Sequence, residues 1–489
     1  MPPFTHNVLT LPQSSLAILI DGLRSDSLAT RVASASSLDK ISSGLGVDRT
    51  IDELIPFLAD SIDDDDTVLL AIATVLPKLV DLLPAHHRPV LLKPLELLLT
   101  VEESSVRQAA AASLIIILPT FPKQALVQEL PPLILRLGHS SFFTSRLSAA
   151  DLLPVLVQHL TDSKSTTDEA VDASAPADAA APDPDLQAAK ELYEALARDD
   201  TPMVRRAAYT VLPALLKSIT TSNDDTLTTL TDTLLPLFTS LAVDGQDSVR
   251  LITPATTVAV INLLPHPYSI TATTVVTQRL LPTYLAAAAD RSWRVRWSCA
   301  VNFATLLAAI TPKDGSGTDS AVFFKLRQAY TTLLHDPEPE VRSAAIAVLP
   351  VLCESVSRSD DKATPDSTTG ELPPSPVAAL ALSLLPSLPQ LTSDAHAHVR
   401  AALAAVLPLL APPLGAAQTQ SHLLPLLLPL LRDPDSAVRL ALLSNLKAIN
   451  EVVGADTLAQ AVLPAVVELA EDTKWRVRQA VIEEVRTAR

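Results

Sequence analysis

The sequence predicts an all-α protein, an α-α superhelix of about eleven helix-pair repeats in a curved array. Its 489 residues exceed the roughly 250 to 300 that one compact core holds, so the chain is either several domains or one repeat array. Glycine numbers 10 and aromatic residues are 3%, which suits helices joined by short turns better than a sheet. A Val-Arg pair also recurs along the chain, and a fixed period is the signature of stacked repeats.

The Val-Arg pair defines the length of the repeat. Its copies are 38 or 39 residues apart in half of the intervals and 45 to 59 apart in the others. The full copies end at Arg107, Arg205, Arg250, Arg296, Arg342, Arg400, Arg439 and Arg478, and looser copies end at Arg31, Leu69 and Arg146. An aspartate stands six residues earlier at Asp63, Asp199, Asp244, Asp290, Asp336, Asp394, Asp433 and Asp472.

Each repeat is predicted to contain two helices. The first carries an Ile-Pro or Leu-Pro pair near its start, where the missing N–H of proline is harmless. These prolines are Pro56, Pro236, Pro282, Pro425 and Pro464. An acidic turn such as DPDSAVR follows, and its Asp and Ser side chains can cap the second helix. Because one helix pair cannot bury its apolar faces alone, neighbouring repeats must stack.

The repeated Asp and Arg predict a ladder of ion pairs, each Asp pairing with an arginine of its own or the adjoining repeat. An exposed ion pair contributes only about 0 to 1 kcal/mol, so the ladder is expected to set register rather than stability. The Val-Arg arginines are therefore interpreted as stacking residues rather than partner contacts.

Five prolines stand inside the predicted second helices, eight residues after the arginine position. A proline there removes a backbone hydrogen bond and costs about 3 kcal/mol or more. Kinked or shortened second helices are therefore expected at Pro77, Pro154, Pro213, Pro350 and Pro408.

The longer intervals locate two insertions. Residues 162–186 and 357–376 are rich in Ala, Asp, Ser and Pro and poor in large apolar side chains, so both are predicted to be disordered. They divide the chain into repeats 1–4 (14–161), repeats 5–8 (187–356) and repeats 9–11 (377–489).

Composition also restricts the function. A net charge of −17 argues against nucleic acid and favours protein partners. The only two cysteines, Cys299 and Cys353, cannot form a disulfide framework or a thiolate cluster, which fits a reducing compartment. Residues 401–431 lack Asp, Glu, Lys and Arg, but prolines and a polar string are expected to cut them into two short helices, so no membrane span is predicted.

No enzyme motif is visible in the sequence. A Gly-rich phosphate loop, a nucleophile elbow and a cysteine with a matched histidine are all missing. His86 and His87, like His396 and His398, lack carboxylates at ligand spacing and are interpreted as surface residues. We therefore expect a protein that is not an enzyme and has neither cofactor nor metal.

Several strings identify a family. Repeats of this length resemble HEAT repeats, and ILIDGLRSD, FFTSR, DDTPMVRRAA, DRSWRVRW and NEVVGADTLAQAVLPAVVELAEDTKWRVR resemble the scaffold (A, 65 kDa regulatory) subunits of protein phosphatase 2A. The resemblance runs along most of residues 14–489. It implies a non-catalytic scaffold that holds the catalytic subunit together with a regulatory B-type subunit for serine/threonine dephosphorylation, located in the cytoplasm and also in the nucleus.

The resemblance also implies two binding sites on the turns within repeats. The regulatory-subunit site comprises Asp63, Asp64, Glu102, Glu103, Phe142, Phe143, Thr201, Pro202, Arg205, Arg206, Asp247, Ser248, Ser292, Trp293 and Arg294. The family more often has Trp at the position of Phe142. Lys474, Trp475 and Arg476 would begin the catalytic-subunit site, and the family's fifteen repeats imply that four repeats beyond Arg489 are missing.

Each site has a simpler interpretation. Trp293 and Trp475 suit interface anchors, although an aromatic side chain can also pack on its own repeat. Arg205 and Arg206 cannot face the same way on a helix, so one is expected in the ladder and the other free for an acidic partner. The acid run from Asp63 to Asp66 is either a solvated, capping turn or a partner contact.

One alternative function is kept. A transport-receptor-like or other HEAT adaptor protein would bind cargo on its inner surface, but such a protein does not predict the DDTPMVRR and SWRVR strings.

Overall fold

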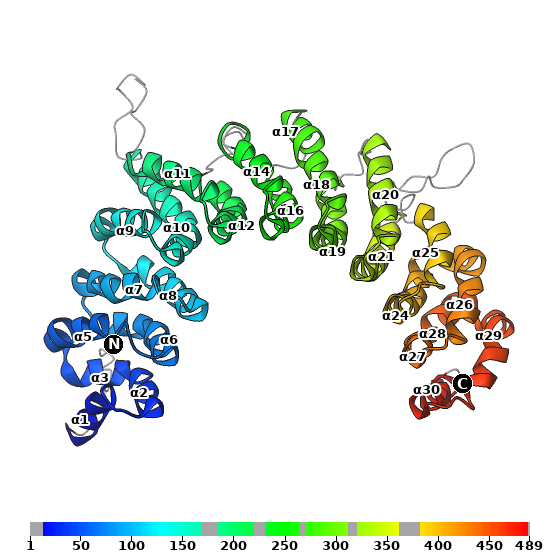
Figure 1. The fold of residues 1–489 in the computed structure, drawn as a ribbon, viewed down its shortest axis with the longest axis horizontal. Helices are drawn as coiled ribbons and strands as arrows, with labels where there is room; N and C mark the ends of the chain where they lie inside the picture. Colours follow the sequence, from blue (N-terminus) through cyan, green and yellow to red (C-terminus); the bar gives the residue numbers. More distant parts are fainter. Residues whose placement is uncertain are drawn as a thin grey trace, which may run out of the picture. The chain divides into compact units, whose positions relative to one another are not determined.

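The computed structural model describes residues 13–168, 184–219, 230–264, 270–311, 320–360 and 382–487. Every regular element in these ranges is helical, which confirms the predicted all-α class. The helices form two compact units, Met1–Leu241 and Ala242–Arg489, and each unit is a stack of helix pairs (Figure 1).

The first unit contains the helix pairs of repeats 1 to 5 and the first helix of repeat 6. Its elements are α1 (Gln13–Gly22), α2 (Leu28–Ala35), α3 (Leu38–Leu45), α4 (Val47–Arg49), η1 (Thr50–Leu54), α5 (Ile55–Asp60), α6 (Asp66–Val75), η2 (Leu76–Asp81), η3 (Ala85–Leu91), α7 (Leu92–Leu98), α8 (Ser104–Ile117), η4 (Leu118–Thr120), α9 (Lys123–Gly138), α10 (Phe143–Asp168), α11 (Pro184–Ala197), α12 (Pro202–Ile219), η5 (Leu230–Leu234) and α14 (Leu235–Ala242).

The second unit continues the same pattern to repeat 11. Its elements are α15 (Asp247–Arg250), α16 (Thr253–Leu263), α17 (Ile270–Val275), η6 (Val276–Leu280), α18 (Leu281–Ala288), α19 (Trp293–Ile310), α20 (Ser320–Leu334), α21 (Pro339–Asp360), η7 (Leu385–Ser387), α23 (Leu388–Leu391), α24 (Ala397–Val406), η8 (Leu407–Leu410), α25 (Ala411–Gln418), η9 (Thr419–Leu423), α26 (Leu424–Leu431), α27 (Ser436–Leu443), α28 (Leu446–Val453), α29 (Ala455–Leu469) and α30 (Trp475–Thr487).

Stacking of second helices builds the core of each unit. In the first unit α6 packs on α8 and α10 on α12, and in the second α16 packs on α19 and α19 on α21. The valine of the Val-Arg pair is fully buried in these contacts, as at Val106, Val204, Val295, Val341 and Val438. The valine therefore belongs to the core, and the arginine beside it lies at the turn.

Buried tyrosines join the two helices of three repeats. The hydroxyls of Tyr193, Tyr284 and Tyr330 donate to the carbonyl oxygens of Ala208, Cys299 and Ala345, each fifteen residues further along the chain. Each hydroxyl is thereby satisfied inside an apolar core. Burial raises the pKa of the Cys299 thiol, so this cysteine stays protonated.

Most prolines of the first helices lie near the start of an α-helix, as predicted, and a π-helical turn precedes them. Each of Pro56, Pro236, Pro282 and Pro425 follows a π-helical turn, η1, η5, η6 or η9, and Pro464 lies inside α29. A proline ring clashes with the carbonyl four residues earlier, and a widened π turn places the carbonyls differently. Pro56, Pro236, Pro282 and Pro425 are each the second residue of the α-helix that follows the π turn, so the prediction is confirmed for these four prolines and was wrong for Pro464.

The prolines of the second helices follow two patterns. At Pro77 and Pro408 the α-helix ends and a 3₁₀ turn begins, so the helix is shortened as predicted. Pro154, Pro213 and Pro350 instead lie inside the continuous helices α10, α12 and α21. Shortening is therefore confirmed at two of the five positions.

The predicted insertions overlap the ends of helices. Helix α10 continues to Asp168 and α11 begins at Pro184, so residues 162–168 and 184–186 are helical. Helix α21 likewise continues to Asp360. The remaining parts, residues 169–183 and 361–376, lie outside the described residues.

The uncharged stretch lies within Ala397–Leu431, which is long and apolar enough by composition to cross a membrane. Its most apolar window is 44% buried. Gly415 interrupts the helix with a φ of 75° and a ψ of 173°, and the leucines on both sides, such as Leu410 and Leu427, are buried. The stretch therefore consists of core helices of repeats 9 and 10.

Candidate protein-binding ridge

The ladder connects successive repeats through ion pairs. In seven described turns the arginine Nε donates to the aspartate of the following repeat over 2.5 to 3.0 Å, and in five of them Nη2 also donates to the second carboxylate oxygen. The described pairs are Arg31–Asp64, Arg146–Asp199, Arg250–Asp290, Arg296–Asp336, Arg342–Asp394, Arg400–Asp433 and Arg439–Asp472. The sequence left open whether the pairing lies within a repeat or between repeats, and these pairs lie between repeats.

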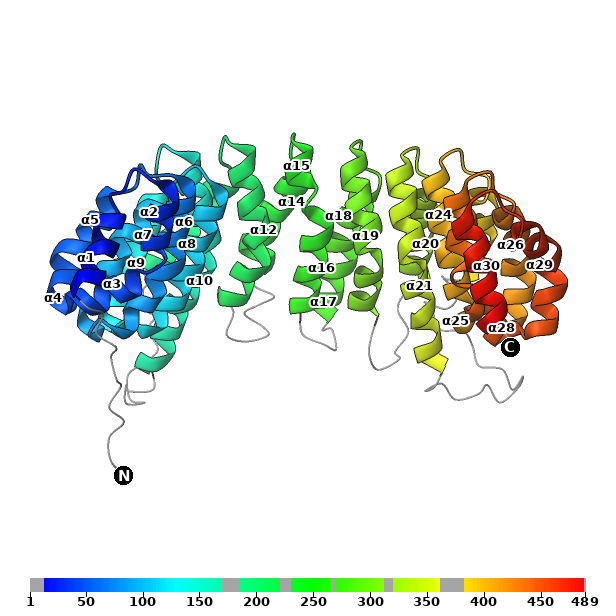
Figure 2. The same ribbon diagram turned by 90° about the horizontal axis from the view of Figure 1, so that it is seen from below.

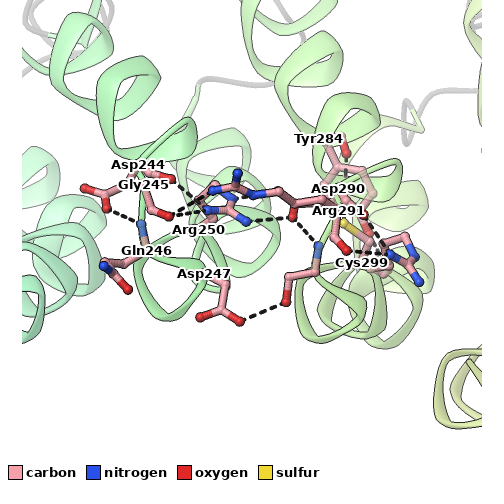
Figure 3. A network of polar contacts seen from close by, with 11 residues as sticks. Asp244, Gly245, Gln246, Asp247, Arg250, Tyr284, Asp290, Arg291 and Cys299 are labelled. Carbon is pink, nitrogen blue, oxygen red and sulfur yellow. Dashed lines mark hydrogen bonds and ion pairs between the residues drawn. The ribbon is translucent and has the colours of Figure 1, made fainter.

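Each arginine also closes its own turn. Nη1 of Arg250 donates to the carbonyl oxygens of Asp244 at 2.8 Å and Gly245 at 3.2 Å, while its Nε and Nη2 reach Asp290 (Figure 3). Asp290 in turn accepts the backbone N–H of Ser292 at 2.7 Å, at the start of α19. One guanidinium and one carboxylate thus hold the turns of two successive repeats in place and connect them to each other.

The ladder is more buried than predicted. Side-chain exposure in these seven pairs is between 2% and 21%. The small contribution of an exposed pair therefore does not apply, because removing one partner of a buried pair leaves an uncompensated charge and costs about 3 to 5 kcal/mol. The prediction that the ladder lies at the surface was wrong.

The electrostatics of the carboxylates agree with this geometry. Burial alone would raise the pKa of Asp199, Asp290, Asp394 and Asp433, but hydrogen bonds from the arginine and from a backbone N–H outweigh burial and hold the pKa below its ordinary value. The hydrogen bond to Asp290 likewise raises the pKa of Arg250. All these groups are therefore charged at neutral pH.

The second repeat differs from the predicted register by one residue. Arg31 pairs with Asp64, not with Asp63. Asp65 follows and caps α6, because its carboxylate accepts the N–H of Thr67 at 2.9 Å. Two members of the acid run therefore have structural roles, and Asp63 remains exposed.

The turns within repeats lie at one edge of each unit, the upper edge in Figure 2. In the first unit Glu102, Phe142, Phe143 and Arg206 are exposed there, whereas Glu103, Thr201, Pro202 and Arg205 are partly buried. Glu103 caps α8 by accepting from Ser105, and Arg205 donates to the carbonyl oxygens of Asp199 and Asp200. The division between Arg205 and Arg206 follows the prediction from helix geometry.

In the second unit four predicted site residues form one cluster. Ser292 Oγ donates to Asp247 at 2.9 Å, and Arg294 lies 3.6 Å from the same carboxylate. The Arg294 guanidinium also lies over the Trp293 ring, 5.6 Å from its centroid. Ser248 is partly buried beside this cluster. The cluster presents an indole that is 37% accessible, with the Arg294 guanidinium over its ring.

The residues predicted to contact the catalytic subunit repeat this arrangement. Trp475 is 61% exposed, and Arg476 lies over its ring at 5.5 Å. Lys474 is exposed beside them, and its N–H donates to Asp472. Exposed indoles that carry an arginine are typical of protein interfaces.

Sequence reasoning missed three apolar side chains at or beside these turns. Met203, Val243 and Trp297 are all exposed. Met203 lies inside the DDTPMVRR string, and Trp297 directly follows an arginine of the ladder, so both could have been found from the repeat register. Within the described residues, no group of three His, Cys, Asp or Glu side chains is placed to hold a metal ion.

Comparisons with known proteins agree with the repeat. The HEAT repeat family model matches residues 326–356 and 423–453. The PP2A regulatory A protein of Schizosaccharomyces pombe is 34% identical over 298 residues, 61% of this chain and 45% of that protein. Its counterpart in Saccharomyces cerevisiae is 30% identical over 60% of this chain and 42% of its own length.

The chain is thus similar to PP2A regulatory A subunits and contains HEAT repeats. The human 65 kDa A beta isoform is also similar, 38% identical over 41% of this chain and 30% of that protein. The chain spans less than half the length of these A subunits. They are named as regulatory subunits, in agreement with the prediction of a protein that is not an enzyme.

Solved structures support the same fold. Kap121p bound to Nup53p has a TM-score of 0.58 at 15% identity, covering 98% of this chain and 49% of that one. Kap121p bound to Ste12p has a TM-score of 0.57 at 16% identity. At such low identity these similarities concern the helical solenoid.

Proposed function

We propose that this chain is a non-catalytic scaffold of protein phosphatase 2A. The turns of its N-terminal repeats hold a regulatory B-type subunit, and the C-terminal turn that contains Trp475 contacts the catalytic subunit. The observation that supports this most strongly is the relation to PP2A regulatory A subunits, together with turns that the ladder holds in register.

The exposed side chains suit this function. Trp293 and Trp475 are rigid aromatic anchors with few rotatable bonds, and Arg206 offers a free charge for an acidic partner. A scaffold that holds two subunits at once raises the concentration of each near the other, which directs the phosphatase to particular substrates. We expect the complex to form in the cytoplasm, with the nucleus as a second location.

The test is capture of a purified PP2A regulatory B-type subunit by the full chain. Trp293→Ala and Arg206→Glu should each weaken capture about tenfold or more, because each removes an interface anchor. Val351→Ala, which truncates an exposed side chain of the second helix α21, is the matched control and should bind like the unmodified chain. Normal capture by both ridge variants would refute the assignment of this surface.

A second function has one observation in its favour. Ile115 and Ile116 in the first unit, and Val301, Val351 and Leu409 in the second, are exposed apolar side chains on second helices. A transport receptor that holds cargo on its inner surface would use such residues, and Kap121p, which shares the fold, is described as bound to Nup53p. For this alternative, Val351→Ala and Leu409→Ala would weaken binding and Trp293→Ala would not.

A further inference from the structure

One arginine of the ladder lacks the carboxylate that its equivalents have. Arg107 closes its own turn, since Nη1 donates to the carbonyl oxygens of Val101 at 2.7 Å and Glu102 at 2.6 Å. In the seven described pairs, the Nε edge of the equivalent arginine contacts an aspartate of the next repeat. The position that would supply this aspartate to Arg107 is Ser140, and within the described chain Arg107 has no ion pair.

Ser140 takes over one of the two roles of the missing aspartate, the capping of the following helix. Its Oγ accepts the N–H of Phe142 at 3.2 Å, as Asp290 accepts the N–H of Ser292 at 2.7 Å in another repeat. The serine thus keeps the capping hydrogen bond but brings no negative charge to the guanidinium. The turn is built as in other repeats, and its anion is missing.

The surroundings leave the charge of Arg107 incompletely compensated. Burial lowers the pKa of Arg107, and attraction to Asp151 and Glu103 offsets this only in part. Burial in turn raises the pKa of Asp151, and Glu103 is engaged in capping α8. A partly buried cation without a bonded carboxylate is unfavourable, so an anion supplied from outside would form a favourable charge-assisted pair with it.

The missing ion pair lies between two repeats that other hydrogen bonds already connect. Thr144 Oγ1 donates to the carbonyl oxygen of Thr100 at 2.9 Å, and Ser148 Oγ donates to that of Leu99 at 2.7 Å, so hydroxyls connect repeats 3 and 4 where the ion pair is missing. The exposed rings of Phe142 and Phe143, 70% and 40% accessible, directly follow the vacant position. A prepared cation and two exposed rings therefore lie on the turns of two successive repeats.

We propose that Arg107 is the docking point for an aspartate or glutamate side chain of the bound regulatory subunit, with Phe142 and Phe143 covering that contact. The inference rests on the proposed function and specifies the partner's chemistry at one turn. A carboxylate is favoured because the equivalent guanidinium edge binds one in seven described pairs, five of them bidentately, and bidentate carboxylate recognition is what this planar group provides.

Two substitutions in the full chain test the proposal, one at the cation and one at the position of the missing carboxylate. Arg107→Gln removes the cation. Ser140→Asp supplies the missing carboxylate from within the chain, so it should raise the melting temperature and at the same time occupy Arg107. Ser140→Asn is the neutral control, because it keeps a capping oxygen and adds no charge. The readout is the dissociation constant for a purified PP2A regulatory B-type subunit, measured beside the melting temperature.

We expect Arg107→Gln and Ser140→Asp each to weaken binding about tenfold, and Ser140→Asn to bind normally. If the unmodified chain binds and both charged-site variants bind equally well, the docking role of Arg107 is overturned while the scaffold function stands. A more stable Ser140→Asp variant with unchanged binding overturns it as well. If the unmodified chain binds no regulatory subunit, the proposed function fails, and this inference fails with it.

Discussion

At the scale of single residues, one Asp-Arg pair performs three tasks wherever the ladder is present. The arginine closes its own turn and reaches forward to the next repeat, and the aspartate caps the helix that follows it. Because the pair is largely buried, its charges compensate each other and cannot be removed singly without penalty. The ladder therefore contributes to stability as well as to register.

Substitution of one ladder arginine tests this view. Arg296→Ala leaves Asp336, whose side chain is 2% exposed, without its cation, so unfolding should become easier by about 3 to 5 kcal/mol. Denaturant unfolding followed by circular dichroism measures the change. Arg49→Ala is the control, because its pair with Glu53 is solvent-exposed and its loss should change little. Equal, small effects of both substitutions would contradict a stabilising ladder.

The sequence predicted the members of the ladder but not their burial. Fixed spacing identified Asp290, Asp336 and Asp394 as equivalent, since a repeat places equivalent residues in equivalent positions. Burial depends on how closely neighbouring turns approach, which no single repeat encodes. The pairing of Arg31 with Asp64 was missed because four consecutive aspartates offer several candidates and spacing alone selected Asp63.

At the scale of helices, the repeats depend on residues that interrupt regular structure. Gly46 and Gly454 each end one helix and begin the next, with φ near 80° and ψ of 174° and 155°. Such dihedrals are nearly restricted to glycine because a side chain would clash with the backbone. These glycines set the entry into the first helices of repeats 2 and 11.

A backbone test follows for Gly454. Gly454→Ala should destabilise the chain by about 1 to 3 kcal/mol, although an added Cβ would meet no atom within 4 Å, because the cost comes from the backbone conformation. Gly245→Ala is the matched control, since that glycine also has open space and does not have a positive φ. The melting temperatures of the two variants should differ clearly. A Gly454→Ala variant as stable as Gly245→Ala would show that strain is not the cause.

Helix type was predictable and helix bounds were less so. Apolar spacing and capping turns predicted two helices in each repeat, and the buried valines confirm that pattern. The prolines caused the errors, because a proline can be accommodated by a π turn, as at Pro282, by a 3₁₀ turn, as at Pro408, or inside a continuous helix, as at Pro350. The choice depends on packing against neighbouring repeats.

At the scale of the whole molecule, both units follow the same rule of one core valine, one ladder pair and one exposed turn for each repeat. Exceptions to the rule are informative. Leu69 and Ser140 interrupt the ladder in repeats 2 to 4, and Trp293 and Trp475 place exposed indoles on two of the turns. Under the proposed scaffold function these exceptions are the expected contact points for partners.

The assignment of ridge residues to partners depends on the resemblance rather than on the repeat. Periodicity predicts which residues lie at turns, but a turn bound by a partner and a solvated turn have the same spacing. The structure adds exposure and neighbours. It separates Phe142 and Arg206, which are exposed, from Glu103 and Asp64, which already serve as a cap and an ion-pair partner.

The most direct test of the scaffold is affinity capture of the full chain from its own cells, with the captured proteins quantified by mass spectrometry. The account predicts that PP2A catalytic and regulatory B-type subunits are enriched together, and that Trp475→Ala reduces the catalytic subunit while Trp293→Ala reduces the regulatory subunit. Enrichment of import factors or nucleoporins without phosphatase subunits would contradict it.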